Sequence, residues 1–436
     1  MDTDLRDGLR ALSEEARTPQ WDAAALWRDT VRHHRRRTAV RLAAAAACLA
    51  LVGFAAVQLV AGDRTHRPLP ADVPFGELHL PRTVHAPDPW APGTEETGPP
   101  GPLAVLAADD RERLDGLRAT TVMSWYGVSA VDGAVHWLDL PSSQGTPGRW
   151  PGSAALSPDG RVIAYSRFSD EEQSHLVGWT VYDTTTGETL DLDPARGFEI
   201  RPDTLIGDMM DLAFSGDSHY LVTFAGSRAT PSTKQLVAWD VETGEPSLAE
   251  RTTAYWQPNL GLAPSGVLWT RNKTAYLFHP DTGETSLRQE PRWPLLASYG
   301  PSGAFAYVGH DGPKVTSKRP WTLYVAPAGR QAREVALGFE PRRIDGWRDE
   351  QRVVVDDGET YAVVDITTGK SSTERLTGLN GWGGLASDLW ANDLVEGTRP
   401  PHVVSPLLVR RAGLGLAVLT LGGAALIWWR RVRHGG

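Results

Sequence analysis

A turn motif that recurs along the middle of the chain constrains its fold more than any other feature of the sequence. An apolar strand ends at an aspartate, and a glycine follows four residues later. The aspartate side chain can cap a type I turn, and the glycine can adopt the positive φ that closes a hairpin. Three copies place these residues at Asp183 and Gly187, Asp240 and Gly244, and Asp365 and Gly369, and in a fourth copy His279 replaces the aspartate before Gly283. The sequence therefore predicts a series of β-hairpins.

A second turn precedes these hairpins and sets the size of the repeating unit. Its best copy is Ser157-Pro158-Asp159-Gly160, which joins two apolar strands, so that each unit offers about four short strands. Successive hairpin glycines, with a weaker copy at Gly329 included, are 57, 39, 46 and 40 residues apart. A four-stranded propeller blade takes about 40 to 50 residues. The sequence thus indicates a propeller built from such blades.

The number of blades stays open at six or seven. The five clear units are joined by a fainter one at residues 137–145. A seventh can be assembled from residues 102–106 and 382–390, because propeller rings are commonly closed by strands from both ends of the domain. The predicted fold is mainly β, a single six- or seven-bladed β-propeller flanked by two transmembrane α-helices, with seven blades slightly favoured.

The paired turns resemble the blades of TolB-like and WD-repeat β-propellers over roughly residues 103–395. The chain departs from the WD-repeat pattern in one respect, because the Trp-Asp dipeptide typical of the strand ends of WD repeats occurs clearly only at Trp239-Asp240. Such propellers serve mostly as rigid recognition platforms and only sometimes as enzymes, so the resemblance implies a binding role. We also expect the tryptophans of the strands, such as Trp137 and Trp179, to pack between blades rather than to form a glycan-stacking surface.

Two apolar runs are each long enough to cross a membrane. Residues 42–61 contain Gln58 as their only polar side chain, and residues 412–429 contain only Thr420. Helices of this length cover about 30 Å of hydrocarbon at a rise of about 1.5 Å per residue. The alternatives are a cleaved signal peptide for the first run and a buried core helix for the second.

Arginine placement predicts the orientation of both runs. Five arginines lie within residues 32–41, directly before the first run, among them Arg35, Arg36 and Arg37, and only two follow the run closely. Because cytoplasmic flanks carry excess positive charge, the N-terminus should lie inside and the propeller outside. The second run returns the chain to the cytoplasm, with Trp428 and Trp429 at the interface and Arg430 and Arg431 beyond it. The predicted localisation is the cell membrane, with two passes and both termini cytoplasmic.

These features divide the chain into consecutive segments. The predicted order is a cytoplasmic segment with short amphipathic helices (1–41), a transmembrane helix (42–61), a Pro-rich extracytoplasmic stalk (62–102), the β-propeller (103–395), a linker (396–411), a second transmembrane helix (412–429) and a cytoplasmic tail (430–436). A closed ring brings its first and last strands together, so both connections should leave the ring at nearly the same place. We expect the stalk to fold back along the ring, with residues 77–80 paired to a blade.

The cytoplasmic segment carries the one sign of an intracellular partner. Leu5, Leu9, Leu12 and Ala16 share one helical face, and an arginine cluster adjoins an alanine-rich span. This arrangement resembles the N-termini of actinobacterial single-pass proteins linked to extracytoplasmic-function sigma factors. The resemblance implies a cytoplasmic sigma factor or regulator as a partner. The alternative is a solvated tail whose arginines only set the topology.

Composition and motifs argue against several classes of function. The net charge is −9, and residues 62–409 hold 30 basic against 46 acidic side chains, which argues against nucleic acid as a partner. The single cysteine, Cys48, excludes an intrachain disulfide and a multi-cysteine metal site. No nucleophile elbow, zinc-protease pair, phosphate-binding loop or EF-hand loop occurs in the sequence. We therefore predict no catalytic, cofactor-binding or metal-binding residues, and no cofactor.

The predicted function follows from the ring fold, the anchors and the missing catalytic motifs. It is a membrane-anchored extracytoplasmic binding, scaffold or sensing module, not an enzyme, which signals to a cytoplasmic regulator in one version. Its expected partners are the lipid bilayer and an extracytoplasmic protein or glycan whose identity the sequence leaves open. The alternative is a propeller-fold hydrolase that acts on cell-wall glycan or peptide through scattered loop carboxylates.

Overall fold

The computed structural model describes most of the second half of the chain and a smaller part of the first. The described residues are 77–115, 118–141, 143, 152–168, 176–193, 212–226, 234–252, 259–310, 321–358, 360–379 and 384–433, with Asp7, Arg10 and Trp27. The predicted first span and Arg35, Arg36 and Arg37 lie outside them. The chain separates into two compact units, of which one is Thr65–Leu407 and the other combines Met1–Arg64 with Leu408–Gly436.

The described residues of the unit Thr65–Leu407 form six four-stranded antiparallel sheets. The sheets are numbered in chain order, and the strands of each are named from the inner to the outer one. Sheet 1 contains β24 (Gly384–Leu385), β1 (Leu103–Asp115), β2 (Arg118–Ser129) and β3 (Val135–Trp137). Sheet 2 contains β4 (Ala154–Leu156), β5 (Val162–Phe168), β6 (Leu176–Asp183) and β7 (Thr189–Leu192). Sheet 3 contains β8 (Leu212–Phe214), β9 (Tyr220–Gly226), β10 (Lys234–Asp240) and β11 (Pro246–Thr252).

The other three sheets follow the same order of strands. Sheet 4 contains β12 (Asn259–Gly261), β13 (Val267–Arg271), β14 (Thr274–His279) and β15 (Glu284–Gln289). Sheet 5 contains β16 (Trp293–Tyr299), β17 (Phe305–His310), β18 (Thr322–Ala326) and β19 (Arg333–Val335). Sheet 6 contains β20 (Arg343–Trp347), β21 (Arg352–Asp356), β22 (Tyr361–Asp365) and β23 (Ser371–Glu374).

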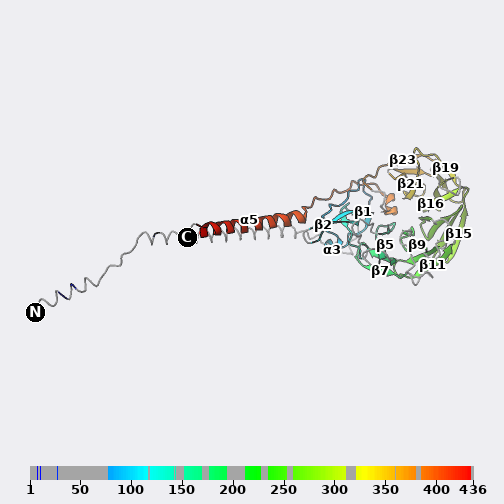
Figure 1. Cartoon of the computed structure of the whole chain (residues 1–436). Helices are drawn as coiled ribbons and strands as arrows, with labels where there is room; N and C mark the ends of the chain where they lie inside the picture. The colour runs from blue at the N-terminus through cyan, green and yellow to red at the C-terminus, as the bar shows by residue number, and fades with distance from the viewer. Residues whose placement is uncertain are drawn as a thin grey trace. The chain divides into compact units, whose positions relative to one another are not determined.

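Apolar clusters between neighbouring sheets join the six sheets into a closed ring (Figure 1). One cluster links sheet 1 to both sheet 2 and sheet 6, and four others fill the remaining interfaces. The middle strands are therefore apolar on both faces, as in Arg352–Asp356, where four of five residues are buried. Trp179 and Trp239 are fully buried between sheets 2 and 3, with ring centroids 6.5 Å apart. The prediction that the strand tryptophans pack between blades is confirmed for these two.

The ring that these residues form has six blades, so the preference for seven is wrong. The sequence suggested one blade from residues 137–145 and another from residues 102–106 and 382–390. The structure merges both into sheet 1, where β1 pairs with β24 on one side and with β2, and through it β3, on the other. The mainly β propeller architecture itself is confirmed.

The ring is closed inside sheet 1, because its inner strand comes from the end of the propeller and the other three from its beginning. Val105 pairs with Leu385 and Leu106 with Gly384. The first and last strands of the ring therefore lie side by side, as expected. A 3₁₀ helix, η3 (Ser387–Ala391), follows directly and buries Leu389 and Trp390. Trp390 contacts Tyr361 of sheet 6 with ring centroids 5.3 Å apart, which ties the closing segment to the last sheet.

The described part of the stalk, residues 77–102, packs around sheet 1 instead of standing free. Leu80 is completely buried, and Pro81 and Thr83 form parallel bridges with Val395 and Thr377. The indole of Trp137, on the outer strand, donates a hydrogen bond to the carbonyl of Asp88 at 2.9 Å. The helix α3 (Thr94–Thr97) follows and leads the chain to β1. The expectation that the stalk folds back along the ring is confirmed for these residues, but the bridges fall at Pro81 and Thr83 and not at residues 77–80.

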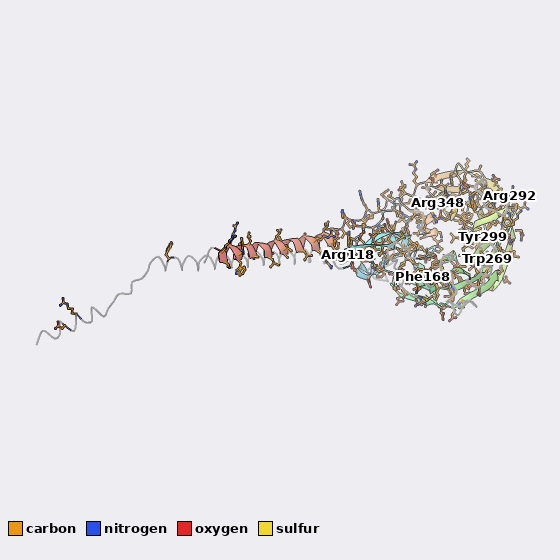
Figure 2. The ribbon with its side chains drawn as sticks, viewed as in Figure 1. Arg118, Phe168, Trp269, Arg292, Tyr299 and Arg348 are labelled. Atoms are coloured by element: carbon orange, nitrogen blue, oxygen red, sulfur yellow. The ribbon has the colours of Figure 1, made fainter. Side chains whose placement is uncertain are left out.

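The long hairpin of sheet 1 provides a second attachment for the stalk. Its paired residues run as far as Asp115 and Arg118, the latter labelled in Figure 2. On β1 the N–H of Glu112 donates to the carbonyl of Pro89 at 3.0 Å. Asp139 forms ion pairs with both Arg111 and Arg113 and caps α3 through the N–H of Glu95 at 3.1 Å. This network fastens the stalk to the first sheet.

The helix α5 (Pro406–Arg433) belongs to the second unit from Leu408 onward. It starts at a proline, which suits the first turn of a helix because its missing N–H needs no partner there. Its segment Pro406–Arg430 has a mean hydropathy of 1.7 and none of its apolar window is buried, so it is long and apolar enough to span a membrane. In the described part of the chain it is the one helix that meets this criterion.

Candidate functional site

Short turns between the inner and second strands of the sheets share one end of the ring. In sheet 2 the hydroxyl of Ser157 donates to Asp159 Oδ1 at 2.6 Å, and the same oxygen accepts the N–H of Arg161 at 3.1 Å. In sheet 3 the hydroxyl of Ser215 contacts Asp217 in the same way. A serine and an aspartate two residues apart thus fix these two turns, which gives a local physical reason for the motif.

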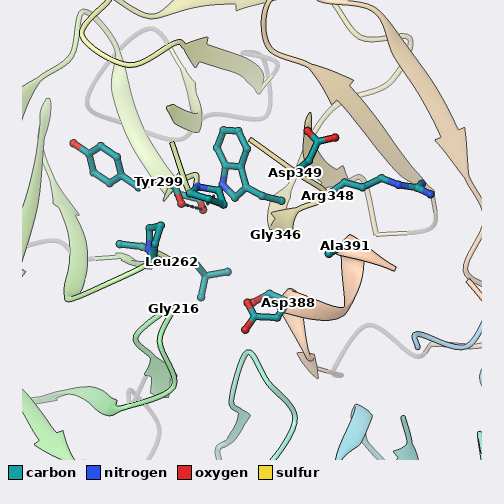
Figure 3. A pocket seen from close by; sticks show the side chains of 14 residues that line it. Gly216, Leu262, Tyr299, Gly346, Arg348, Asp349, Asp388 and Ala391 are labelled. Atoms are coloured by element: carbon teal, nitrogen blue, oxygen red, sulfur yellow. Dashed lines mark hydrogen bonds between the residues drawn. The ribbon is translucent and has the colours of Figure 1, made fainter. Parts of the chain in front are cut away.

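The turn of sheet 3, through Gly216, and the corresponding segments of sheets 4, 5 and 6 line a pocket of about 300 Å³, called the axial pocket below (Figure 3). Four sheets and η3 contribute to it. The lining residues are Gly216 of sheet 3, Leu262, Ala263 and Pro264 of sheet 4, Ser298, Tyr299 and Pro301 of sheet 5, Gly346, Trp347, Arg348 and Asp349 of sheet 6, and Ser387, Asp388 and Ala391 of η3. The volume is that of a site for one small ligand or one side chain.

Close backbone contacts hold the walls of the axial pocket in place. The N–H of Leu262 donates to the carbonyl of Ala297 at 3.3 Å, and the N–H of Tyr299 donates to the carbonyl of Leu262 at 2.8 Å. These bonds join the inner segments of sheets 4 and 5 directly. Between sheets 3 and 4, a Cβ on Gly216 would lie only 1.9 Å from the carbonyl oxygen of Ala263. The backbone around the pocket is therefore closely packed and has little room to move.

The indole of Trp347 forms an ordered apolar surface in the pocket. Its Nε1 donates to the hydroxyl of Ser298 at 2.9 Å. Gly300 lies against the ring, where a Cβ would come within 2.9 Å of its carbon atoms. The glycine thus leaves the space that the indole occupies, and the serine fixes its orientation.

The charged groups near the pocket are mostly neutralised by partners. Arg348 forms ion pairs with Glu374 at 2.8 Å and with Asp393 at 2.9 Å. Asp349 forms an ion pair with Arg352 at 2.5 Å. Asp388 differs, because partial desolvation of its carboxyl group and then the carboxylates of Asp159 and Asp217 raise its pKa to about 6, although the residue as a whole is exposed to solvent. Its charge therefore changes within the physiological range of pH.

A second group of charges lies in sheet 6, away from the lining of the axial pocket. Arg343 Nε contacts Asp345 Oδ1 at 2.7 Å, and Arg343 Nη2 contacts Asp356 Oδ2 at 2.8 Å. Burial raises the pKa of Asp345 to about 7, with Arg343 acting against the shift and Asp356 adding to it. Asp345 Oδ2 has no hydrogen-bond partner in the described part of the chain. Two carboxylates that share one arginine leave a negative charge that a proton can neutralise.

A metal site is not formed by the residues that the structure describes. Across 77–115, 118–141 and the later described ranges, no group of three or more His, Cys, Asp or Glu side chains is placed to hold a metal ion.

No protein-family model matches the chain, and no curated protein does. Solved structures with a similar fold include the β-propeller domain of the Trilobed protease from Pyrococcus furiosus, at 14% identity and a TM-score of 0.39, covering 62% of this chain and 79% of that one. TolB from Acinetobacter baumannii is 14% identical with a TM-score of 0.32, covering 64% and 70% of the two chains. Hsv2p of Kluyveromyces lactis is 11% identical with a TM-score of 0.33, covering 50% and 61%.

The blade-turn residues singled out in the sequence lie in two sets of turns at the same end of the sheets. Asp183, Asp240 and Asp365 each accept two backbone N–H groups, from the residues two and three positions later. The glycines of the motifs all have positive φ: Gly160 (76°), Gly187 (79°), Gly244 (70°), Gly283 (71°) and Gly369 (75°). These residues shape the turns, and none of them lines the axial pocket.

The residues chosen for topology fall mainly on α5. Trp428 and Trp429 are 68% and 51% exposed, and the guanidinium of Arg433 lies 4.9 Å from the centroid of a Trp429 ring. Arg430 is on the same helix.

Sequence reasoning missed the two side chains that give the pocket its character, Trp347 and Asp388. Trp347 is the last residue of the inner strand β20, and Asp388 follows the inner strand β24; both strands contain a glycine, but neither is followed by the Ser-Pro-Asp-Gly pattern. The available signal was positional, since residues after each inner strand must meet at the ring axis.

Proposed function

We propose that the protein is a membrane-anchored extracytoplasmic binding or scaffold module that receives its ligand in the axial pocket. The observation that carries this proposal is the pocket itself, which combines apolar walls, backbone groups and the charged residues Arg348, Asp349 and Asp388 in a frame made by four sheets and η3. Concave sites with apolar lining and few polar groups are the usual places of ligand binding. The rigid turns around it support recognition without a large rearrangement of the protein.

The pocket can be tested as a contact site in the cell. A photo-crosslinking amino acid at Ala391, which lines the pocket, should capture a ligand or partner after irradiation. The same amino acid at Gly283, an outer turn with nothing within 4 Å of its Cβ position, serves as the matched control. Equal capture from both positions, or none from Ala391, would contradict the proposal.

The proposal includes two membrane passes, with residues 42–61 and α5 as the spans and the ring outside. It is supported by the exposed apolar surface of α5 and by the arginines before residue 42. Reporter fusions at residues 30, 200 and 436 provide the test. We expect a cytoplasmic reporter to be active at 30 and 436 and an extracytoplasmic reporter to be active at 200. An active cytoplasmic reporter at residue 200 would contradict this topology.

The proposal further holds that the module is not an enzyme and that residues 1–41 hold a cytoplasmic regulator. A screen of the purified protein on cell-wall glycans and peptides should give no turnover. Turnover that a single Asp or Glu substitution abolishes would contradict the first statement. For the second, a pull-down with residues 1–41 should recover a partner that Leu9→Asp or Trp27→Ala releases. Trp27 is 72% exposed, so its loss removes a contact surface rather than a core.

A further inference from the structure

The carboxylate of Asp388 is the one acidic group at the axial pocket that is left without a partner. Asp159 and Asp217 are held by their own turns, and Asp349 is held by Arg352. The backbone N–H of Asp388 donates to the carbonyl of Pro158 at 3.1 Å, which fixes the residue in position. Its side chain makes no hydrogen bond or ion pair with any other residue that the structure describes. An ordered residue thus presents a carboxylate with open acceptor sites to the pocket.

The surrounding charges favour a positively charged ligand. Asp159 and Asp217, from the turns of sheets 2 and 3, act on Asp388 strongly enough to shift its titration. The lining residues from sheets 4 and 5 carry no charge. Sheet 6 supplies Arg348 and Asp349, and both are already paired. A cation beside Asp388 would therefore meet attraction from three carboxylates, whereas an anion would be repelled.

The walls next to Asp388 favour a ligand with a hydrocarbon part. Leu262, Pro264, Trp347 and Ala391 line the same pocket. Figure 3 shows Leu262 and Asp388 on different sides of the pocket, with Ala391 on the side of Asp388. A bare metal ion would leave these apolar surfaces unused, and a neutral apolar ligand would leave the carboxylate without a partner. A chain of methylene groups that ends in an ammonium group matches both features.

We propose that the axial pocket binds an alkylammonium group of the lysine type, with its methylene groups against Leu262 and Trp347 and its ammonium group at Asp388. This inference rests on the proposed function, which makes the pocket the ligand site. It adds the chemical class of the ligand and the residue that recognises the charge.

Calorimetric titration of the full-length protein in detergent tests the proposal with three probes. Nα-acetyl-lysinamide carries the side chain alone, Nα-acetyl-norleucinamide has a similar chain without the amine, and 1,5-diaminopentane represents a free amine. We expect acetyl-lysinamide to bind with a Kd of about 1 mM at pH 7.5, as suits a ligand of this size. The norleucine probe should bind at least about tenfold more weakly. Comparing the lysine probe with the diamine separates a peptide side chain from a free amine.

Acidity and two variants provide the controls. Because Asp388 titrates near pH 6, affinity for acetyl-lysinamide should fall about tenfold from pH 7.5 to pH 5. Asp388→Asn should remove both the binding preference for the amine and this pH dependence. Asp110→Asn is the matched control, because Asp110 is exposed on β1 and does not line the pocket. It should leave the affinity unchanged.

Several results would overturn the inference. Equal binding of the lysine and norleucine probes would show that the pocket recognises only the apolar chain. Asp388 would then have no role in recognition, although the axial pocket would still be a ligand site. Unchanged affinity in Asp388→Asn, or no binding of either amine at 10 times the expected Kd, would also reject the ammonium assignment. Crosslinking from Ala391 tests the proposed function separately. A failure of the ammonium assignment can therefore be distinguished from a failure of the pocket as a ligand site.

Discussion

Replacement of Gly160 by alanine should destabilise the ring far more than the same change in an outer turn. Gly160 has a φ of 76°, and a Cβ there would lie 2.0 Å from the carbonyl oxygen of Leu103, the first residue of β1. Gly283 has a similar φ of 71°, but nothing lies within 4 Å of its Cβ position. The two variants therefore share the cost of an alanine in a left-handed conformation and differ in the contact with β1.

The loss of unfolding free energy in each variant can be estimated from the interactions that the added methyl group disturbs. The left-handed conformation costs an alanine about 1 kcal/mol, which is the whole effect expected for Gly283→Ala. In Gly160→Ala the backbone of Leu103 must also move. That movement weakens the 2.7 Å hydrogen bond from the N–H of Leu103 to the carbonyl of Gly160, worth about 1 kcal/mol. It also disturbs the completely buried Leu103 side chain, whose burial is worth about 2 kcal/mol. The expected loss is about 3 to 4 kcal/mol.

Urea unfolding of the full-length protein in detergent, followed by tryptophan fluorescence, measures both variants against the unchanged chain. The entropy that alanine removes from the unfolded state is the same in both, so it cancels in the comparison. We expect similar denaturant slopes and a clearly lower midpoint for Gly160→Ala. Equal midpoints for the two variants would refute the reasoning that the turn of sheet 2 is locked against β1.

Three further predictions concern the closing segment, the buried charges and the clasp between the two connections. Trp390→Ala should cost about 3 to 5 kcal/mol in urea unfolding, because Trp390 is 1% exposed. The raised pKa of Asp345, about 7, means that its contribution to stability is present at low pH and lost as pH rises through 7. From pH 5 to pH 8 the free energy of unfolding measured in urea should therefore fall by on the order of 2 kcal/mol, and Asp345→Asn should flatten this dependence. Asp88→Ala removes the acceptor of the Val403 N–H (3.1 Å), so hydrogen exchange should accelerate at Val403 and stay unchanged in β21.

The hairpins were predictable from sequence because their turns are local. Aspartate and glycine four residues apart, as at Asp183 and Gly187, satisfy the same backbone groups wherever the unit lies in the ring. The strands between these turns follow from the apolar runs. The number of blades was harder to predict, because the closing strand has only the residues Gly384 and Leu385. So short a strand has no periodicity to read.

The axial pocket could not be predicted because its residues meet only through the closure of the ring. Gly216, in a turn of sheet 3, and Asp388, in η3, line it together, and no local pattern relates their positions. Trp347 depends on Gly300 for its space and on Ser298 for its hydrogen bond, and both come from the neighbouring sheet. Contacts of this kind depend on tertiary geometry, whereas turn chemistry depends on a few consecutive residues.

The parallel pairing of the two terminal segments of the ring determines how the protein responds to mechanical force. Pro81 pairs in parallel with Val395, through hydrogen bonds from Arg82 N to the Val395 carbonyl (2.6 Å) and from Val395 N to the Leu80 carbonyl (3.1 Å). Tension applied to the two chain ends pulls these parallel segments in opposite directions along their length. The bonds are then loaded together in shear instead of opening one after another. The edge where the chain enters and leaves the ring is thereby the part best arranged to resist a pull.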